Sequence, residues 1–208
     1  MAFSADTLRD RVAIVTGASQ GIGRAIAVEL ARVGAHVVAC SRRREALEPV
    51  ADLVRAEGRR ALAVACDVGD AHQVDEAVAQ ALGAFGRIDI LVNNAGYRIR
   101  APLEELPRSE WDAMVATNLT GVFLFSQAVG RVMIRQRAGK IVNVTSVAGK
   151  TPAMIAQAAR DVPLQRLGRP EEIAWAVVFV ASDQASFMTG ETVYVSGGPR
   201  VANREDSK

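Results

Sequence analysis

The chain has 208 residues, of which 50% are hydrophobic and 23% are charged, and its formal net charge is +2. This balance is typical of a soluble globular protein, so we expect a single domain over residues 1–208 with a flexible polar tail over about residues 199–208. The small net charge argues against nucleic-acid binding. The lack of an apolar run near the roughly 20 residues of a membrane helix argues against a membrane protein, and the lack of a secretory signal predicts a cytoplasmic location.

Short β-branched runs alternate with amphipathic stretches, a pattern typical of an α/β fold whose parallel sheet is covered by helices on both faces. The runs are apolar almost throughout, as expected for strands that are buried on both sides. In chain order the expected strands are Val12–Thr16, His36–Cys40, Ala61–Cys66, Ile88–Asn93, Ile141–Thr145 and Thr192–Ser196. The expected helices are Gly23–Val33, Arg44–Glu57, Ala71–Phe85, Ser109–Arg137 and Pro170–Ser182.

Residues at the expected helix ends have the usual capping chemistry. Ser109 is predicted to cap the long fourth helix, because its hydroxyl can accept a hydrogen bond from a free backbone N–H. Pro170 suits the first turn of the last helix, where its missing N–H has no cost, and Gly34 suits the end of the first helix.

The first expected strand runs directly into the sequence TGASQGIG (residues 16–23), and a helix follows. Glycines let the backbone turn tightly and approach an anion, while the start of a helix offers free N–H groups and a positive dipole end. Ser19 can add a hydroxyl to the same anion. A strand, a glycine loop and a helix in this order predict a site for the pyrophosphate of a dinucleotide.

Three residues separate Gly17 from Gly21, and this spacing resembles the TGxxxGxG loop of the short-chain dehydrogenase/reductase family. Further matches occur in the family's order over nearly the whole chain, from about residue 8 to residue 198. They are Asp67, the sequence NNAG (residues 93–96), Asn118, Ser146, GRPEEIA (residues 168–174) and a TG…GG ending (residues 189–198). The resemblance implies a doubly wound parallel sheet (Rossmann fold) and hydride transfer between a nicotinamide cofactor and a small carbonyl or alcohol substrate.

The choice of cofactor is predicted from the end of the second expected strand. A carboxylate there would accept hydrogen bonds from the adenosine ribose and favour NAD. This chain has Ser41 followed by Arg42 and Arg43, whose guanidinium groups can bind a 2′-phosphate, so we predict NADP over NAD. The alternative is a solvated run of arginines that opens a helix. With the roles that the resemblance implies, including Asp67 near the adenine, the expected cofactor-binding residues are Gly17, Ser19, Gly21, Ile22, Gly23, Ser41, Arg42, Arg43, Asp67, Val68, Asn93, Ala95, Gly96 and Thr151.

The resemblance also implies two catalytic residues, Ser146 to orient the substrate oxygen and Asn118 to support a water relay. In the family a tyrosine transfers the proton, and a lysine four residues later lowers the pKa of that tyrosine and holds the nicotinamide ribose. This pair should follow the serine by roughly a dozen residues. No tyrosine lies between Tyr97 and Tyr194, and the last lysines of the chain are Lys150 and Lys208.

A whole βα unit of the family is missing with that pair. The helix after the fifth strand, the sixth strand and the proline-glycine turn beside the nicotinamide have no counterpart, which corresponds to a deletion of about 45 residues. The missing helix commonly contributes to the family's homo-oligomer interface. Its loss predicts an exposed apolar patch around Val122, Phe123 and Phe125, and with it aggregation or altered assembly.

The remaining reactive side chains are given structural roles. Tyr97 lies beside NNAG but has no accompanying lysine, so it is not expected to replace the missing tyrosine, and Tyr194 is expected in the core. His36 and His72 are not paired with a nucleophile, and no metal-ligand spacing is present. The two cysteines, Cys40 and Cys66, are expected to be buried thiols at strand ends.

Three functions remain open from the sequence. The chain is an NADP-dependent oxidoreductase with low turnover, a binding protein that keeps the nucleotide site without the chemistry, or a truncated product that folds poorly. Measured nucleotide binding and turnover distinguish the three.

Overall fold

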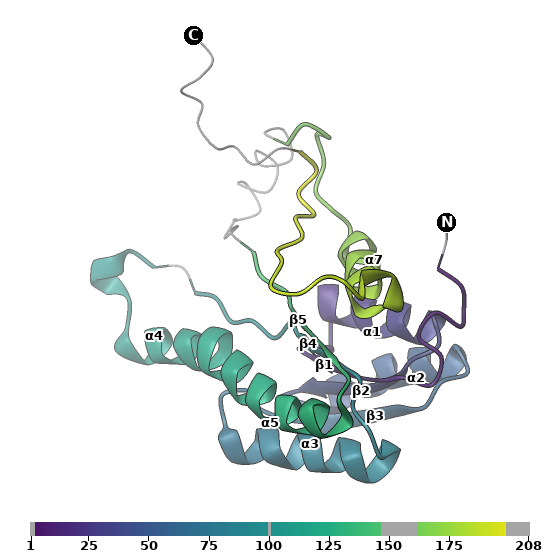
Figure 1. Ribbon diagram of the computed structural model, residues 1–208. Helices are drawn as coiled ribbons and strands as arrows, with labels where there is room; N and C mark the ends of the chain where they lie inside the picture. The colour runs from purple at the N-terminus through teal and green to yellow at the C-terminus, as the bar shows by residue number, and fades with distance from the viewer. Residues whose placement is uncertain (1–2, 100, 147–161, 199–208) are drawn as a thin grey trace.

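The computed structural model describes residues 3–99, 101–146 and 162–198. Five parallel strands form a sheet in the order β3-β2-β1-β4-β5 (Figure 1). The chain leaves β1 toward one edge of the sheet and returns beside β1 with β4, so the strand order reverses between β1 and β4. In α/β sheets such a switch point opens a crevice at the carboxyl ends of the strands. The strands are β1 (Val12–Thr16), β2 (His36–Ser41), β3 (Ala61–Ala65), β4 (Ile90–Asn93) and β5 (Lys140–Asn143).

Helices cover both faces of the sheet (Figure 1). Side chains of α1, α2 and α7 pack against one face, and side chains of α3 and α5 pack against the other. Successive side chains of β1 point to opposite faces of the sheet, so this strand contributes to the hydrophobic core on each face. Ala13 and Val15 face the first group of helices, whereas Val12 and Ile14 face the second. The helices are α1 (Gly21–Arg32), α2 (Glu48–Ala56), α3 (Ala71–Phe85), α4 (Arg108–Val115), α5 (Gly121–Gln136) and α7 (Pro170–Ala181), with short turns η1 (Arg44–Ala46), η2 (Leu103–Glu105), η3 (Ala116–Thr120) and η4 (Asp183–Ala185).

The predicted α/β fold is confirmed, and α3 has the bounds expected from the sequence. Its limits follow from local chemistry. At the start, the Asp70 carboxylate accepts hydrogen bonds from the backbone N–H groups of His72 (2.9 Å) and Gln73 (3.2 Å). At the end, Gly86 takes a left-handed conformation with φ of 76°.

The long helix expected at Ser109–Arg137 is present but differs in two respects. It begins one residue earlier, after Pro107, so Ser109 is not the capping residue. A π-helical turn at Ala116–Thr120 also divides it into α4 and α5. Sequence periodicity does not reveal such a turn, because one residue of extra winding changes the helical pattern very little. Turns of this kind occur often at functional sites.

The prediction of a strand at Thr192–Ser196 is wrong. This segment runs beside β5 in Figure 1 but has no strand structure, and β5 is the edge of the sheet. A strand needs a neighbouring backbone for its hydrogen bonds, and among the described residues no strand pairs with β5 on the side away from β4. Tyr194 is accordingly 54% exposed instead of belonging to the core.

An open groove of about 800 Å³ lies beside β5. Its walls are β5, one side of α7 and the segment Met188–Val195. The groove leaves Ile141 of the edge strand 41% exposed. Among the described residues, this groove lies on the β5 side of the sheet, apart from the crevice between β1 and β4.

An apolar face of α5 lies open to solvent, as the sequence predicted in part. Phe123 is 58% exposed and Leu119, one turn earlier, is 68% exposed. The prediction is wrong for Phe125, which is fully buried against the sheet. The helical run Arg108–Gln136 is also long and apolar enough to cross a membrane by length and composition, a test that core helices of soluble proteins pass as well.

Candidate dinucleotide-binding site

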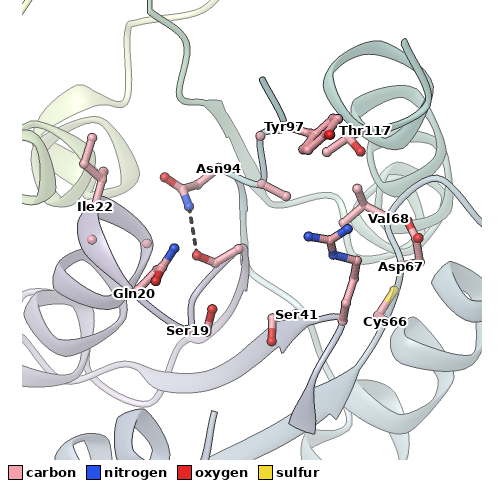
Figure 2. A pocket seen from close by; sticks show the side chains of 16 residues that line it. Ser19, Gln20, Ile22, Ser41, Cys66, Asp67, Val68, Asn94, Tyr97 and Thr117 are labelled. Carbon is pink, nitrogen blue, oxygen red and sulfur yellow. Dashed lines mark hydrogen bonds between the residues drawn. The ribbon is translucent and has the colours of Figure 1, made fainter. Parts of the chain in front are cut away.

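A pocket of about 470 Å³ opens at the carboxyl ends of β1 to β4, where the strand order reverses. Figure 2 shows Ser19, Gln20 and Ile22 on one side of it and Cys66, Asp67 and Val68 on the other. The side chains of Tyr97 and Thr117 lie together at one end of the view. The wall consists of Gly17, Ser19, Gln20, Gly21, Ile22, Gly23, Ser41, Arg42, Cys66, Asp67, Val68, Asn94, Ala95, Gly96, Tyr97 and Thr117.

The glycine loop between β1 and α1 forms the floor. Gly17 has φ of 64°, and a Cβ there would lie 2.8 Å from the Cα of Ala95. Gly21, with φ of 56°, begins α1 and faces open space. A Cβ at Gly23 would collide with the carbonyl oxygen of Gly17. Because the first N–H groups of α1 have no partner within the helix, the loop can hold an anion such as a diphosphate.

Asn94 connects this loop to β4, a role that the sequence did not predict. Its side-chain Nδ2 donates to the carbonyl oxygens of Thr16 (2.9 Å) and Gly17 (3.3 Å). Figure 2 shows the Asn94 side chain pointing at the loop. The hydroxyl of Thr16 in turn accepts the backbone N–H groups of Asn94 and Ala95, both at 3.0 Å. The NNAG sequence therefore fixes the shape of the glycine loop.

The end of β2 brings one positive charge into the wall. Ser41 and Arg42 line the pocket, whereas Arg43 is not among the wall residues. The Ser41 hydroxyl donates to the carbonyl oxygen of Arg43 at 3.0 Å and so holds the turn after β2. Of the two arginines predicted to bind a 2′-phosphate, only Arg42 lines the pocket.

The end of β3 supplies a carboxylate and a thiol. Asp67 Oδ1 accepts the N–H of Gly69 at 2.9 Å, and its own N–H donates to Gln73 at 2.9 Å, so the carboxylate has a fixed orientation. Cys66 is buried as expected, and burial raises the pKa of its thiol to about 12. The pKa of Cys40 is raised for the same reason. Burial therefore favours the protonated form of both thiols, which is the less nucleophilic form.

Comparison with known proteins agrees with this geometry. The model of the short chain dehydrogenase family matches residues 11–158, and a second model, described as enoyl-(acyl carrier protein) reductase, matches residues 148–199. The chain belongs to the short-chain dehydrogenase/reductase family. The 3-oxoacyl-[acyl-carrier-protein] reductase of Synechocystis is 35% identical over 240 residues, which cover 92% of this chain and 97% of the relative.

Solved structures show the same relationship. The crystal structure of a short-chain type dehydrogenase/reductase from Mycobacterium marinum has a TM-score of 0.83 at 30% identity, covering 93% of this chain and 96% of that one. NAD⁺-bound xylitol dehydrogenase also gives 0.83 at 30% identity, covering 92% and 99%. The chain therefore has the fold of this oxidoreductase family, whose members use nicotinamide cofactors.

The short-chain dehydrogenase motif NNAG contributes one residue that does not line the pocket. Asn93 was expected there, but it is 4% exposed and belongs to the core. Its Nδ2 donates to Asn143 Oδ1 (2.9 Å) and to Ser126 Oγ (3.1 Å), which ties β4 to β5 and α5. The alternation of side chains along a strand explains why Asn93 and Asn94 differ. Asn93 is the last residue of β4, and its side chain points into a packed face of the sheet, whereas Asn94 follows the strand and reaches the pocket.

Asn118, one of the two expected catalytic residues, lies in the π-helical turn and holds the chain at Tyr97. Its Oδ1 accepts the backbone N–H of Tyr97 at 2.9 Å, and its Nδ2 donates to the Tyr97 carbonyl at 2.7 Å. Ser146 lies exposed, three residues after the end of β5, and does not line the pocket. Thr151 lies outside the described residues.

Tyr97 is held in a way that does not suit proton transfer. Its hydroxyl donates a short hydrogen bond to the Glu110 carboxylate, and this bond raises the pKa of Tyr97 above its ordinary value. A family tyrosine needs the opposite shift, which a nearby lysine provides. Within residues 3–99, 101–146 and 162–198 the lysine is Lys140, and its ammonium donates to the Ala185 carbonyl at 2.7 Å. In the same ranges no cluster of His, Cys, Asp or Glu side chains could hold a metal ion.

Proposed function

We propose that this chain binds NADP(H) as a short-chain dehydrogenase/reductase with little or no hydride-transfer activity. The observation that carries the cofactor choice is the end of β2, where Arg42 lines the pocket and no carboxylate is present. A guanidinium group favours a 2′-phosphate, whereas a carboxylate would favour the free ribose hydroxyls of NAD. The similar xylitol dehydrogenase structure is NAD⁺-bound, so the fold alone does not favour NADP, and the proposal depends on these side chains.

The glycine loop fits the diphosphate of this cofactor. The positions at Gly17 and Gly23 exclude a Cβ, and Gly21 leaves the space above the start of α1 open. The loop N–H groups and Ser19 would hold the diphosphate, Arg42 the 2′-phosphate and Asp67 the adenine side. When bound, the cofactor would supply a hydride to a carbonyl compound or accept one from an alcohol.

Two observations support low turnover. The Tyr–Lys pair of the family is missing from the sequence, and positioned proton transfer is typically worth about 10²–10⁴ in rate. The alignment to the Synechocystis reductase spans 240 residues although it includes only 92% of a 208-residue chain, so the relative has positions for which this chain has no residue. Loss of both catalytic groups would leave a nucleotide-binding protein without efficient chemistry.

Calorimetric titration with NADPH and NADH tests the binding. We expect saturable binding of NADPH, about 10- to 100-fold tighter than NADH, because charge-assisted hydrogen bonds to a phosphate contribute about 1.5–3 kcal/mol. Ser41→Asp should remove this preference by placing a carboxylate beside the ribose. Equal affinity of the unaltered chain for the two cofactors would contradict the choice of NADP.

Turnover is tested with NADPH and a panel of small carbonyl compounds, with the Synechocystis reductase as the active reference. We expect NADPH oxidation by this chain to be at least about 10²-fold slower than by the reference. A comparable rate would show that other residues replace the missing pair. The alternative, a truncated product that does not fold, predicts neither saturable binding nor a cooperative unfolding transition.

A further inference from the structure

Tyr97 supplies an aromatic ring to the wall of the nucleotide pocket, and none of the other described wall residues has one. Figure 2 shows Tyr97 beside Thr117 and above Val68 and Asp67, on the side away from the glycine loop. This is the side on which the proposed function places the adenine. The flat face of an aromatic side chain is a surface on which a base can stack.

The Tyr97 ring is held both at its backbone and at its hydroxyl. Asn118 Oδ1 accepts the Tyr97 backbone N–H at 2.9 Å, and Asn118 Nδ2 donates to the Tyr97 carbonyl at 2.7 Å. The hydroxyl donates to the carboxylate of Glu110 on α4. A side chain that is fixed at both ends loses little further freedom when a ligand binds, so it suits a binding surface better than a mobile side chain does.

The π-helical turn that carries Asn118 supports the neighbouring part of the wall as well. Gly121, directly after the turn, approaches Val68 so closely that a Cβ at Gly121 would lie 2.7 Å from Val68 Cγ2. Thr117 of the same turn lines the pocket. One helical segment thus fixes both Val68 and Tyr97 around the space where the adenine is expected.

Arg42 and Tyr97 face the same space. The hydrogen bond to Glu110 raises the pKa of Tyr97, and the positive charge of Arg42 opposes this rise. Such an interaction weakens with distance, so the guanidinium group lies near the ring, and both side chains line the pocket. In a nucleotide the 2′-phosphate is attached to the ribose carbon next to the one that carries the base. A ligand whose 2′-phosphate meets Arg42 therefore has its base close to Tyr97.

We infer that the adenine of the bound nucleotide stacks on the ring of Tyr97, and that Glu110 is a positioning residue for this ring. The inference rests on the proposed function and names the contact that holds the base. The Tyr97 hydroxyl then serves to orient the ring instead of transferring a proton. Stacking accepts any flat base, so the selectivity of the site comes from the 2′-phosphate.

NMR titration of the whole chain with two adenine nucleotides tests the stacking directly. Adenosine 2′,5′-bisphosphate carries the base and the 2′-phosphate, and adenosine 5′-monophosphate lacks only the 2′-phosphate. Protons above the face of an aromatic ring are shielded, so binding should move the signals of the two C–H protons of the adenine upfield. The same titrations give both dissociation constants. Adenine signals that do not move upfield when the unaltered chain is saturated overturn the inference, whatever the variants do.

Substitutions at Tyr97 separate the ring from the hydroxyl. Tyr97→Leu should weaken both nucleotides by about 10-fold or more and abolish the upfield shifts, because the ring is lost. Tyr97→Phe keeps the ring, so most of the shift should remain and the affinities should fall by less than about 3-fold. Tyr194→Leu is the matched control, because Tyr194 is the other tyrosine of the chain and is not a wall residue. A loss as large in Tyr97→Phe as in Tyr97→Leu would contradict stacking.

Substitutions at Glu110 test the positioning role. Glu110→Ala leaves the ring without its anchor and should reduce the upfield shifts to the same extent as Tyr97→Phe. Glu110→Gln keeps an acceptor for the hydroxyl and should restore the shifts of the unaltered chain. Adding Glu110→Ala to Tyr97→Phe should change nothing more, since the bond is already lost. A further loss in the double variant would show that Glu110 does not act through Tyr97.

The two nucleotides also separate this inference from the proposed function. Arg42→Ala should weaken only the bisphosphate, whereas Tyr97→Leu should weaken both nucleotides by the same factor. Equal affinity of the unaltered chain for the two overturns the NADP assignment, and upfield shifts that depend on Tyr97 would still support stacking. Tighter binding of the bisphosphate without upfield shifts overturns stacking and leaves the NADP assignment intact. Failure of both nucleotides to bind overturns both.

Discussion

Thr16 and Asn94 are joined by two hydrogen bonds behind the glycine loop of the candidate nucleotide pocket. The Thr16 hydroxyl accepts the Asn94 N–H at 3.0 Å, and the Asn94 side chain donates to the Thr16 carbonyl at 2.9 Å. The same hydroxyl accepts the N–H of Ala95 and donates to Val92. Thr16 is 1% exposed, so water does not replace these bonds readily. One side chain thus couples the glycine loop on β1 to the residues after β4.

Thr16→Val tests this coupling, because valine has nearly the same shape but no hydroxyl. We expect a loss of about 1–3 kcal/mol in the free energy of unfolding, since two part-buried N–H groups lose their acceptor. Nucleotide affinity should fall as well, because the loop loses its support. Thr16→Ser keeps the hydroxyl and should keep most of the stability and affinity, as measured by urea unfolding and calorimetry. Equal behaviour of the two variants would show that the hydroxyl is unimportant.

Arg42 and Arg43 are equivalent in the sequence but not in the structure, and single substitutions separate them. Arg42→Ala should weaken NADPH binding by about 10-fold or more and leave NADH binding nearly unchanged, because only NADPH carries the 2′-phosphate. Arg43→Ala should change either affinity by less than about 3-fold, since Arg43 is not a wall residue. The two affinities for each variant come from the same calorimetric titration. A larger effect at Arg43 would mean that the bound state draws this side chain inward.

The sequence was sufficient for the half of the fold whose signals are local. The glycine loop, the helix that follows it and the apolar strands β1 to β4 depend on short patterns, and the structure has them where they were expected. Asn93 shows one limit of prediction from the sequence. Whether a residue at the end of a strand faces the core or the pocket depends on where pairing with the neighbouring strands stops, and the sequence does not give that point. The segment Thr192–Ser196 shows another limit, because its residues favour a strand but no described strand pairs with it.

Two features of the site depend on contacts that no sequence pattern reveals. The hydrogen bond between Tyr97 and Glu110 joins a loop to α4 and determines the direction of the tyrosine pKa shift. The π-helical turn at Ala116–Thr120 places Asn118 against the Tyr97 backbone. A residue type can be matched to a family motif, whereas its partners follow only from packing.

His36 should make stability depend on pH below about pH 7. Burial and then the positive charge of Arg60 lower the pKa of His36, while Asp10 opposes the shift. Its Nδ1 accepts the backbone N–H of Arg60 at 3.1 Å, and its ring stacks on Phe85. The folded state therefore binds the proton more weakly than the unfolded state, whose pKa is about 6.5. Stability is fully present above that pH and falls as the pH drops below it, by at most about 1.4 kcal/mol per pH unit.

Urea unfolding at several pH values measures the contribution of His36. His36→Gln keeps an acceptor for the Arg60 N–H and removes the titration, so its stability should vary less with pH in this range. His72→Gln is the control, because His72 is an exposed side chain on α3. An unchanged pH profile in His36→Gln would show that carboxylates, and not this histidine, cause the acid sensitivity.

The exposed face of α5 should govern the association state. Phe123 is 58% exposed, and Leu119 and Ile134 on the same helical run are 68% and 77% exposed. Burial of such side chains favours association, at roughly 25 cal/mol per Å² of apolar surface. Phe123→Lys should therefore lower the mass measured by light scattering, or reduce aggregation, without lowering the melting temperature. Gln80→Lys adds the same charge at an exposed position of another helix, α3, and should leave the measured mass equal to that of the unaltered chain. If the unaltered chain is monomeric and does not aggregate, this exposed face does not drive association.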